Sequence, residues 1–417
     1  MKHKIQKITS MIIVAVVILT CFSSCKEAGE EHKETTEAVG VTEVATTENE
    51  AVGTLTTCFL LGNTANMPKM DMDILKDEIK SIAGTGEKYC LIVLDGEPEL
   101  NIKEEVKFPK RFVNQKKNNE KVIQEHVEKI YNTIADDPEI DILEGLDMAS
   151  RALSGSGEKK RLVVFSSGLS TAGDLNFAEN PELISKRPAE IVDMLSANKS
   201  IPDLSGVDLV WYSLGDVAGE QKKLSNMNEY QLKRLWSEII TAGKPAKVEL
   251  DKAPPKMDSN ENMIEYPTVT LVTFPGVISI KETEIGFNAN KATFKDKDKA
   301  IEALSYYADC IKAAGHDFYV VGSTATYGTT EGCLVLGEQR ASVVKDILCN
   351  DYGISEESLY IYSIGQMNLG GNYEWRCNDL DENGKFVEEI GAENRKVMII
   401  DAESEDGKRF MQQWENK

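Results

Sequence analysis

The chain has 417 residues, of which 41% are hydrophobic, so it is long enough for two or three domains that each bury a core. Its formal net charge of −22 at pH 7 argues against nucleic acid and anionic lipid surfaces as partners, because phosphate groups repel a chain this acidic. The simplest interpretation of the charge is that it keeps the protein soluble.

Residues 1–24 have the pattern of an export signal. Three lysines near the N-terminus form a basic end, and the apolar stretch Met11–Cys21 that follows is too short to span a bilayer as a mature helix. The sequence Phe-Ser-Ser-Cys that comes next resembles a bacterial lipobox. This resemblance implies that Cys25 carries the lipid, with palmitate as an expected acyl group. An ordinary secretory signal that is cleaved nearby is the alternative.

Residues 25–53 are rich in Glu, Thr, Ala and Val, and they contain neither an aromatic residue nor a periodic apolar pattern. Such a segment cannot bury enough apolar surface to offset the entropy lost on folding. We therefore expect a disordered tether between the lipid anchor and the first folded domain.

Between residues 54 and 250, continuous apolar runs alternate with helical patterns. The runs TCFLLG, YCLIVLDG, RLVVFSSG and VDLVWYSLG indicate buried strands, and stretches such as Asp71–Ile82 and Ile142–Leu153 have the apolar spacing of helices. Strands of this kind, separated by helices, predict a parallel sheet that is covered on both faces. The order of the elements resembles a von Willebrand factor A-like (vWA) domain, which implies a doubly wound, mainly parallel sheet and a role in protein interaction.

The vWA family binds a divalent cation through an Asp-x-Ser-x-Ser loop after the first strand. Here Gly62, Thr64 and Asn66 stand at those three positions, and Ser167 replaces the Asp of a later Asp-Gly. Hydroxyl and amide groups supply little negative charge to offset the dehydration of the cation, so we expect no metal at this loop. Asp141, near the place of a further family ligand, is interpreted as a helix N-terminal residue.

Residues 251–278 contain adjacent prolines and a Ser/Asn-rich run, which predict an interdomain linker that passes into an edge strand. Residues 279–402 then show a helical pattern, the apolar run HDFYVV, a Thr/Gly-rich loop and a second helical pattern. The segments IGFNANKATF, VVGSTATYG, LGEQRASVV and NRKV resemble the OmpA-like peptidoglycan-associating domain. That resemblance implies an α/β fold and a partner in the cell wall.

Members of the OmpA-like family usually have Gly-His-Thr-Asp where this chain has GSTA, which ends at Ala325. In the family, that Asp and an Arg fifteen residues later hold the ammonium and the carboxylate of the wall's diamino acid. The Arg is kept as Arg340, whereas Ala325 offers no charge to the ammonium. The resemblance therefore implies a non-standard pocket that includes Arg340, Asn394 and Arg395. The alternative is that Arg340 only ties the loop to neighbouring carbonyl groups.

The segment NDLDENGKFVEE contains a partial calcium-loop pattern. Asp379, Asp381 and Asn383 match its first half, but Ile390 stands at the twelfth position, where a bidentate Glu is needed. We favour a solvated Asx turn and keep weak calcium binding as the alternative. Calcium is the one cofactor that the sequence suggests.

The histidines and cysteines do not indicate an enzyme. Only His126 and His316 fall in the predicted folded regions, and neither neighbours a nucleophile or a metal-ligand motif, so His316 is expected to serve a turn before a strand. Cys58 and Cys90 lie in runs that would form neighbouring strands. We expect buried free thiols there, with a disulfide as the alternative.

The sequence as a whole predicts a non-enzymatic, lipid-anchored protein of the cell envelope that binds or scaffolds. Its OmpA-like domain would face peptidoglycan or another envelope component, and its vWA-like domain would bind a protein. The alternatives are an interaction adaptor without wall binding and an enzyme that acts on wall polymers. In the C-terminal tail, Phe410 and Trp414 are expected to pack one helical turn against a neighbour. The predicted boundaries are 1–24 (signal), 25–53 (tether), 54–250 (vWA-like domain), 251–278 (linker), 279–402 (OmpA-like domain) and 403–417 (tail).

Overall fold

The computed structural model describes residues 54–110, 113–252, 267–371 and 374–417. The predicted signal, Cys25, the tether and much of the predicted linker lie outside these residues. Within the described ranges, no helix combines the length and the apolar character needed to cross a membrane. The described chain forms two sheets, and we call residues 54–252 the N-terminal body, residues 267–275 the strap and residues 276–417 the C-terminal body.

The N-terminal body contains a six-stranded sheet, and its mainly parallel pairing is what the sequence predicts. Its strand order is β3-β2-β1-β4-β5-β6, and every neighbouring pair is parallel except β2 with β3. The sheet grows in both directions from β1, so its topological switch point lies between β1 and β4. The strands are β1 (Leu55–Leu61), β2 (Lys88–Val93), β3 (Glu99–Glu105), β4 (Arg161–Phe165), β5 (Asp208–Tyr212) and β6 (Lys247–Lys252).

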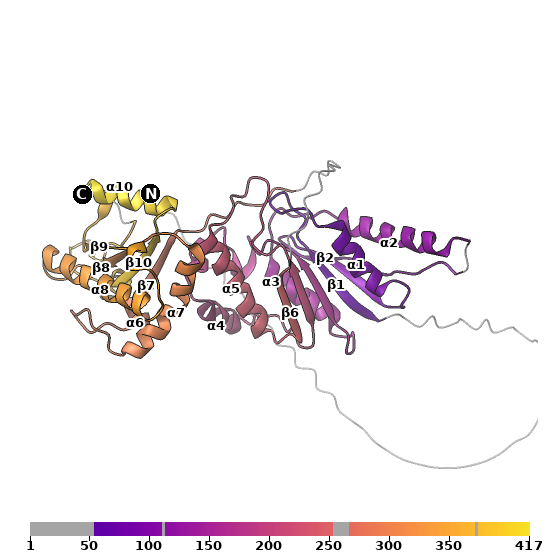
Figure 1. The fold of residues 1–417 in the computed structure, drawn as a ribbon, viewed down its shortest axis with the longest axis horizontal. Coiled ribbons are helices and arrows are strands. Elements are labelled where there is room, and N and C mark those ends of the chain that lie inside the picture. The colour runs from indigo at the N-terminus through magenta and orange to yellow at the C-terminus, as the bar shows by residue number, and fades with distance from the viewer. Residues whose placement is uncertain (1–53, 111–112, 253–266, 372–373) are drawn as a thin grey trace, which may run out of the picture. The chain divides into compact units, whose positions relative to one another are not determined.

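Helices cover both faces of this sheet because alternate side chains of its buried strands point to opposite sides. In β1, Phe59 and Leu61 pack in one apolar cluster with α1 and α2, whereas Cys58 and Leu60 pack in another with α3, α4 and α5. Figure 1 shows α1 and α2 beside one another next to β1 and β2. The helices are α1 (Met72–Ile82), α2 (Gln115–Tyr131), α3 (Ile142–Leu153), α4 (Pro188–Asn198) and α5 (Asn226–Ala242), with single 3-10 turns η1 (Gly173–Leu175) and η2 (Pro181–Ser185).

The C-terminal body contains a four-stranded mixed sheet in the order β7-β10-β8-β9. One face packs against α7 and α8, and the other packs against the C-terminal helix α10. Phe410 of α10 is fully buried and its ring stacks on Trp414, which confirms the expected helical turn. The elements are β7 (Val277–Lys281), α6 (Glu282–Ile285), α7 (Lys297–Ala314), β8 (Phe318–Ser323), α8 (Thr330–Asn350), η3 (Glu356–Ser358), β9 (Leu359–Gly365), η4 (Leu369–Gly371), α9 (Glu388–Asn394), β10 (Lys396–Asp401) and α10 (Glu405–Glu415).

Two glycines bring the backbones of β8 and α8 into direct contact. A Cβ on Gly322 would lie 1.9 Å from the carbonyl oxygen of Gly337, and a Cβ on Gly337 would lie 2.9 Å from the carbonyl oxygen of Gly322. No real side chain tolerates such distances, so this approach of strand and helix needs glycine on both sides. The contact fixes where α8 crosses the sheet, and it thereby positions Arg340, which lies on α8 just beyond Gly337.

We expect Gly322→Ala to destabilise the protein by about 1–3 kcal/mol, because the added methyl group meets a backbone oxygen that cannot rotate away. Gly155→Ala is the control, since a Cβ there meets no heavy atom within 4 Å and the change should stay within about 0.5 kcal/mol. Urea unfolding of both variants measures the two values. Equal midpoints for the two variants would contradict the proposed backbone contact.

Candidate functional site

The loop that follows β1 contains Thr64 and Asn66, which the expected vWA resemblance assigns to metal-ligand positions. Thr64 and Asn66 are buried there, and Asn66 Nδ2 donates a 2.9 Å hydrogen bond to the carbonyl oxygen of Val269 in the strap. Ser167, after β4, is also buried, and its Oγ accepts a hydrogen bond from the amide of Leu169. A cavity of about 10 Å³ remains between these groups, which is room for one water molecule at most. The chain itself therefore fills this edge of the sheet.

Two aspartates near this edge accept backbone hydrogen bonds. Asp141 caps α3 by accepting from the amide of Glu144, as the sequence predicts, and Asp95 accepts from the amides of Glu97 and Asp136. Burial raises the pKa of both aspartates, which disfavours the charged form that binds a cation. Across the part of the chain that the structure describes, no three His, Cys, Asp or Glu side chains gather as metal ligands.

In the C-terminal body, two of the three predicted ligand residues meet at one carboxylate. Oε2 of Glu282 lies 3.4 Å from Nη1 of Arg340 and 3.2 Å from Nε of Arg395. Arg340 is only 2% exposed, and its Nε donates to the carbonyl oxygen of Lys291. Its guanidinium carbon also lies 4.7 Å from the ring centroid of Phe287. The alternative interpretation from the sequence, in which Arg340 ties a loop to a carbonyl group, therefore describes its contact with Lys291.

The pKa of Arg340 is lowered from its ordinary value, and burial is the largest cause. Burial lowers the pKa of Arg340, Glu282 raises it, and the nearby charge of Arg395 lowers it again. Arginine stays protonated even so, because its ordinary pKa lies far above neutral pH. Two guanidinium groups that converge on one carboxylate form an arrangement suited to carboxylate recognition, and here the carboxylate is internal.

Asn394, the third predicted ligand residue, does not join this pair. It is fully buried, its Oδ1 accepts from the amide of Cys377, and its Nδ2 donates to the carbonyl oxygen of the same residue. These two hydrogen bonds hold the chain at Cys377 against the last residue of α9. The geometry therefore shows Asn394 in a structural role, because both of its side-chain polar atoms bind the backbone of Cys377.

The position of the missing family Asp is covered by chain from further along the sequence. Ala325 is buried, and a Cβ on Gly391 would lie 3.4 Å from its side chain. Beside it, the carboxylate of Asp379 accepts hydrogen bonds from the amide and hydroxyl of Thr326, and it pairs with Arg376 at 3.0 Å. Burial opposes the ionisation of Asp379, but these hydrogen bonds and the charge of Arg376 outweigh burial and lower its pKa. A carboxylate thus lies next to the position that Ala325 leaves empty.

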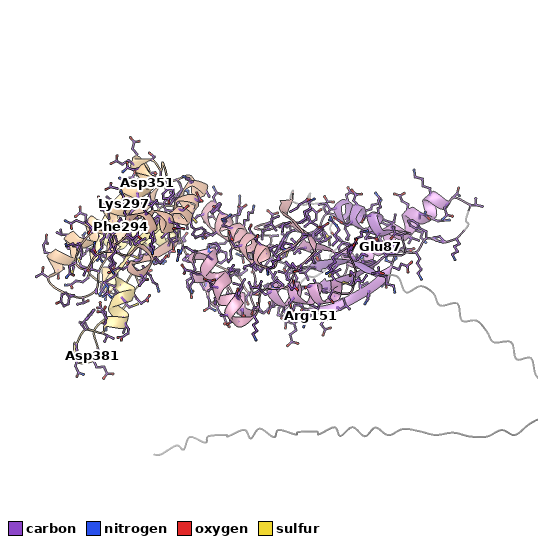
Figure 2. The ribbon with its side chains drawn as sticks, turned by 90° about the horizontal axis from the view of Figure 1, so that it is seen from below. Glu87, Arg151, Phe294, Lys297, Asp351 and Asp381 are labelled. Carbon is purple, nitrogen blue, oxygen red and sulfur yellow. The ribbon has the colours of Figure 1, made fainter. Side chains whose placement is uncertain are left out.

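The three residues of the predicted calcium loop have different surroundings. Asp379 is fully buried, whereas Asp381 lies on a loop that extends from the C-terminal body (Figure 2). Asp381 Oδ1 accepts from the amides of Asn383 and Lys385, which is an Asx-type turn. The favoured interpretation of a solvated turn therefore describes Asp381 and not Asp379. Calcium binding stays a prediction.

Cys58, Cys90 and His316 lie in structural settings. Cys58 and Cys90 are paired in register on β1 and β2, and both are buried free thiols, as expected. His316 lies just before β8 and its Nε2 is 2.7 Å from Oδ1 of Asp401, which also accepts from the amides of Glu403 and Ser404. This contact fits the turn role that the sequence predicts.

Sequence reasoning missed Glu282 and the roles of Arg376 and Asp379. Glu282 directly follows β7, and its amide donates to the carbonyl oxygen of Arg395, so the pairing of β7 with β10 places the two side chains together. That pairing was the signal that could have identified Glu282. The partnership of Asp379 with Thr326 joins loops far apart in the sequence, and the local pattern held no sign of it.

No family model matches this chain, and no curated protein matches it. Parts of it are similar to solved structures. The periplasmic domain of Helicobacter pylori MotB is 18% identical over 34% of this chain and 84% of that chain, with a TM-score of 0.23. The peptidoglycan-associated lipoprotein from Burkholderia pseudomallei is 21% identical over 29% of this chain and 87% of that chain, with a TM-score of 0.22. The cell wall anchor of the T6SS from Pseudomonas aeruginosa is 21% identical over 30% of this chain and 78% of that chain, with a TM-score of 0.23. Similarities of this size do not by themselves assign a function.

We expect titration calorimetry of the protein with Mg²⁺ or Mn²⁺ to give no binding heat, because Thr64, Asn66 and Ser167 at this edge carry no negative charge. Calcium is the separate case. If the loop at Asp381 binds, its affinity should lie at about 10⁻⁴–10⁻³ M, and millimolar calcium should raise the Tm of the parent but not of Asp381→Ala. A micromolar Mg²⁺ signal that is lost on changing Thr64 and Asn66 would contradict the first expectation, and an unchanged Tm in the parent would dismiss the second.

Proposed function

We propose that the protein is a non-enzymatic, lipid-anchored binding or scaffolding component of the cell envelope. The C-terminal body faces peptidoglycan through a non-standard pocket, and the N-terminal body, taken as vWA-like, binds a protein without a metal. The observation that carries the proposal is the convergence of Arg340 and Arg395 on the carboxylate of Glu282. The OmpA-like sequence segments support it, since they bring Arg340 to the position of the family's carboxylate-binding Arg.

The chemistry of this arrangement defines how a wall peptide would bind. A planar guanidinium group pairs with a carboxylate through two parallel hydrogen bonds, and wall peptides carry carboxylates. The ligand carboxylate would take the place that Glu282 holds in the unbound protein. Ala325 supplies nothing to an ammonium group, so the diamino acid of the wall would bind weakly unless a neighbouring carboxylate such as Asp379 serves it.

Export and anchoring complete the proposal. The basic end, the short apolar stretch and the Ser-Ser-Cys sequence support cleavage before Cys25 and acylation of that residue. Two or more acyl chains give a stable anchor, because each buried CH₂ group contributes about 0.8 kcal/mol. The body that follows the tether would then lie on the extracytoplasmic side of the membrane.

Co-sedimentation with purified sacculi tests wall binding. We expect Arg340→Ala to weaken binding by about tenfold to hundredfold, the effect of losing a charge-assisted hydrogen bond. Glu282→Gln should strengthen binding because it removes the internal competitor, and Ala325→Asp should strengthen binding to walls that contain the diamino acid. Arg409→Ala is the control, since Arg409 is exposed on α10 and pairs with Glu374 and Asp406.

Identical sedimentation of the parent, Arg340→Ala, Glu282→Gln and Ala325→Asp would rule out the pocket. Because Arg340→Ala leaves Glu282 without one partner, circular dichroism must show that each variant is folded. If Arg340→Ala does not fold, Glu282→Gln still tests the pocket. Absence of all sacculus binding would favour the adaptor without wall contact. New fragments released from the sacculi and detected by chromatography would favour an enzyme.

We expect Cys25→Ser to release the protein from the membrane fraction, because the acyl chains can no longer be attached. Fractionation of cells that express the parent or the variant, followed by immunoblotting, measures this. Cys377→Ser is a matched control, since Cys377 is an exposed free thiol of the C-terminal body. A Cys25→Ser protein that stays full length in the membrane would show that the lipobox assignment is wrong.

A further inference from the structure

The strap crosses the N-terminal body at the carboxyl ends of β1 and β4, where it is held through its main chain. Gln221 Nε2 donates to the carbonyl oxygen of Val272 at 2.7 Å, and Gln221 Oε1 accepts from the amide of the same residue at 2.9 Å. Asn66 Nδ2 donates to the carbonyl oxygen of Val269, and the amide of Ala65 donates to that of Pro267 at 3.0 Å. Each of these contacts is made to a backbone atom of the strap.

The paired contact of Gln221 imitates the hydrogen bonding between two β-strands. A carboxamide carries a donor and an acceptor side by side, so it can bind the C=O and the N–H of one residue at once. Such recognition tolerates any residue whose backbone is extended. The strap is therefore held in a way that a foreign segment could reproduce.

Two side chains of the strap add an apolar component. Val269 and Val272 are 4% and 3% exposed, and both belong to the apolar cluster beneath the sheet edge, whereas Leu271 between them is 46% exposed. Thr270 contributes a hydrogen bond from its hydroxyl to Glu139 at 2.6 Å. A segment outside helix and sheet, with apolar side chains three positions apart, fits this edge.

The location and an imperfect fit both indicate a binding site. In open α/β sheets, ligands bind beyond the carboxyl ends of the strands at the topological switch point, which here lies between β1 and β4. Among the described residues, three buried oxygens at this place find no hydrogen-bond partner, namely Oγ1 of Thr64, Oδ1 of Asn66 and Oε2 of Glu139. An unpaired buried polar atom costs free energy, so a segment that supplies the missing donors would bind better than the strap does.

We propose that the carboxyl edge of the N-terminal body is a metal-independent cleft for a peptide that is held through its backbone, and that residues 267–272 are its intramolecular occupant. The partner is a protein segment outside helix and sheet with apolar side chains three positions apart, and it binds by displacing the strap. The proposal rests on the protein-interaction role proposed above for the N-terminal body. A tethered occupant competes at a local concentration of about 1 mM, so the strap lowers the apparent affinity for every other segment.

A fluorescent peptide with the sequence of residues 265–275, EYPTVTLVTFP, tests the cleft by anisotropy with the full chain. The double variant Val269→Asp/Val272→Asp should bind the peptide at least tenfold more tightly than the parent, because its own strap no longer fits the apolar positions. Leu271→Asp is the matched control on the exposed side of the strap and should bind like the parent. Adding Gln221→Ala to the double variant should reduce peptide binding at least tenfold, and a scrambled peptide should not bind.

If the double variant keeps the circular dichroism spectrum of the parent yet binds the peptide no better, the cleft does not take foreign segments and the proposal fails. A second measurement does not need that variant to fold. Excess unlabelled peptide should accelerate hydrogen exchange at the Val272 amide of the parent chain, and unchanged exchange at peptide concentrations of several millimolar overturns the proposal. Sacculus binding by the same variants should equal that of the parent, which separates this outcome from a failure of the wall-binding proposal.

Discussion

A buried polar group without a partner costs free energy, and this constraint governs both places where the chain departs from the families that it resembles. In the N-terminal body, the positions of the metal ligands hold hydroxyl and amide groups, and Asn66 is paired with the main chain of the strap. In the C-terminal body, Thr326 beside Ala325 is paired with Asp379 from a distant loop. In both places a segment from elsewhere in the chain supplies a hydrogen-bond partner.

This substitution gives binding a particular physical character. A site that already holds an internal partner binds a ligand by exchange, so affinity depends on the difference between two sets of contacts. Glu282 holds the arginine pair together in the absence of ligand, which avoids the repulsion between two close guanidinium groups. Selectivity then comes from how much better the external group fits than the internal one.

Sequence patterns predicted the elements whose signal is local. The continuous apolar runs identified β1, β2, β4 and β5 because a strand buried on both faces needs apolar residues at every position. They did not identify β3, whose sequence ELNIKEE has a single buried residue at Ile102, because an edge strand needs only one apolar face. The strap was interpreted as a linker, since its hydrogen bonds go to side chains of remote loops.

The candidate site divides in the same way. Arg340 was identified because its spacing from the loop after β8 is a property of adjacent sequence. The burial of Asp379 was not, since it depends on Thr326 and Arg376 and only the latter lies nearby in the chain. Residues that only the fold brings together show no pattern in a short stretch of sequence. These same residues decide whether a ligand position is open or filled.

The contact between Gly322 and Gly337 constrains how this protein can evolve. Two side chains that touch can change together, because a loss of volume in one can be offset by a gain in the other. A contact between two backbones has no volume to exchange, so an alanine at either position meets an obstacle that no substitution at the other can remove. The two glycines should therefore be retained together. A homologue that loses either glycine must shift the whole helix α8, and Arg340 with it.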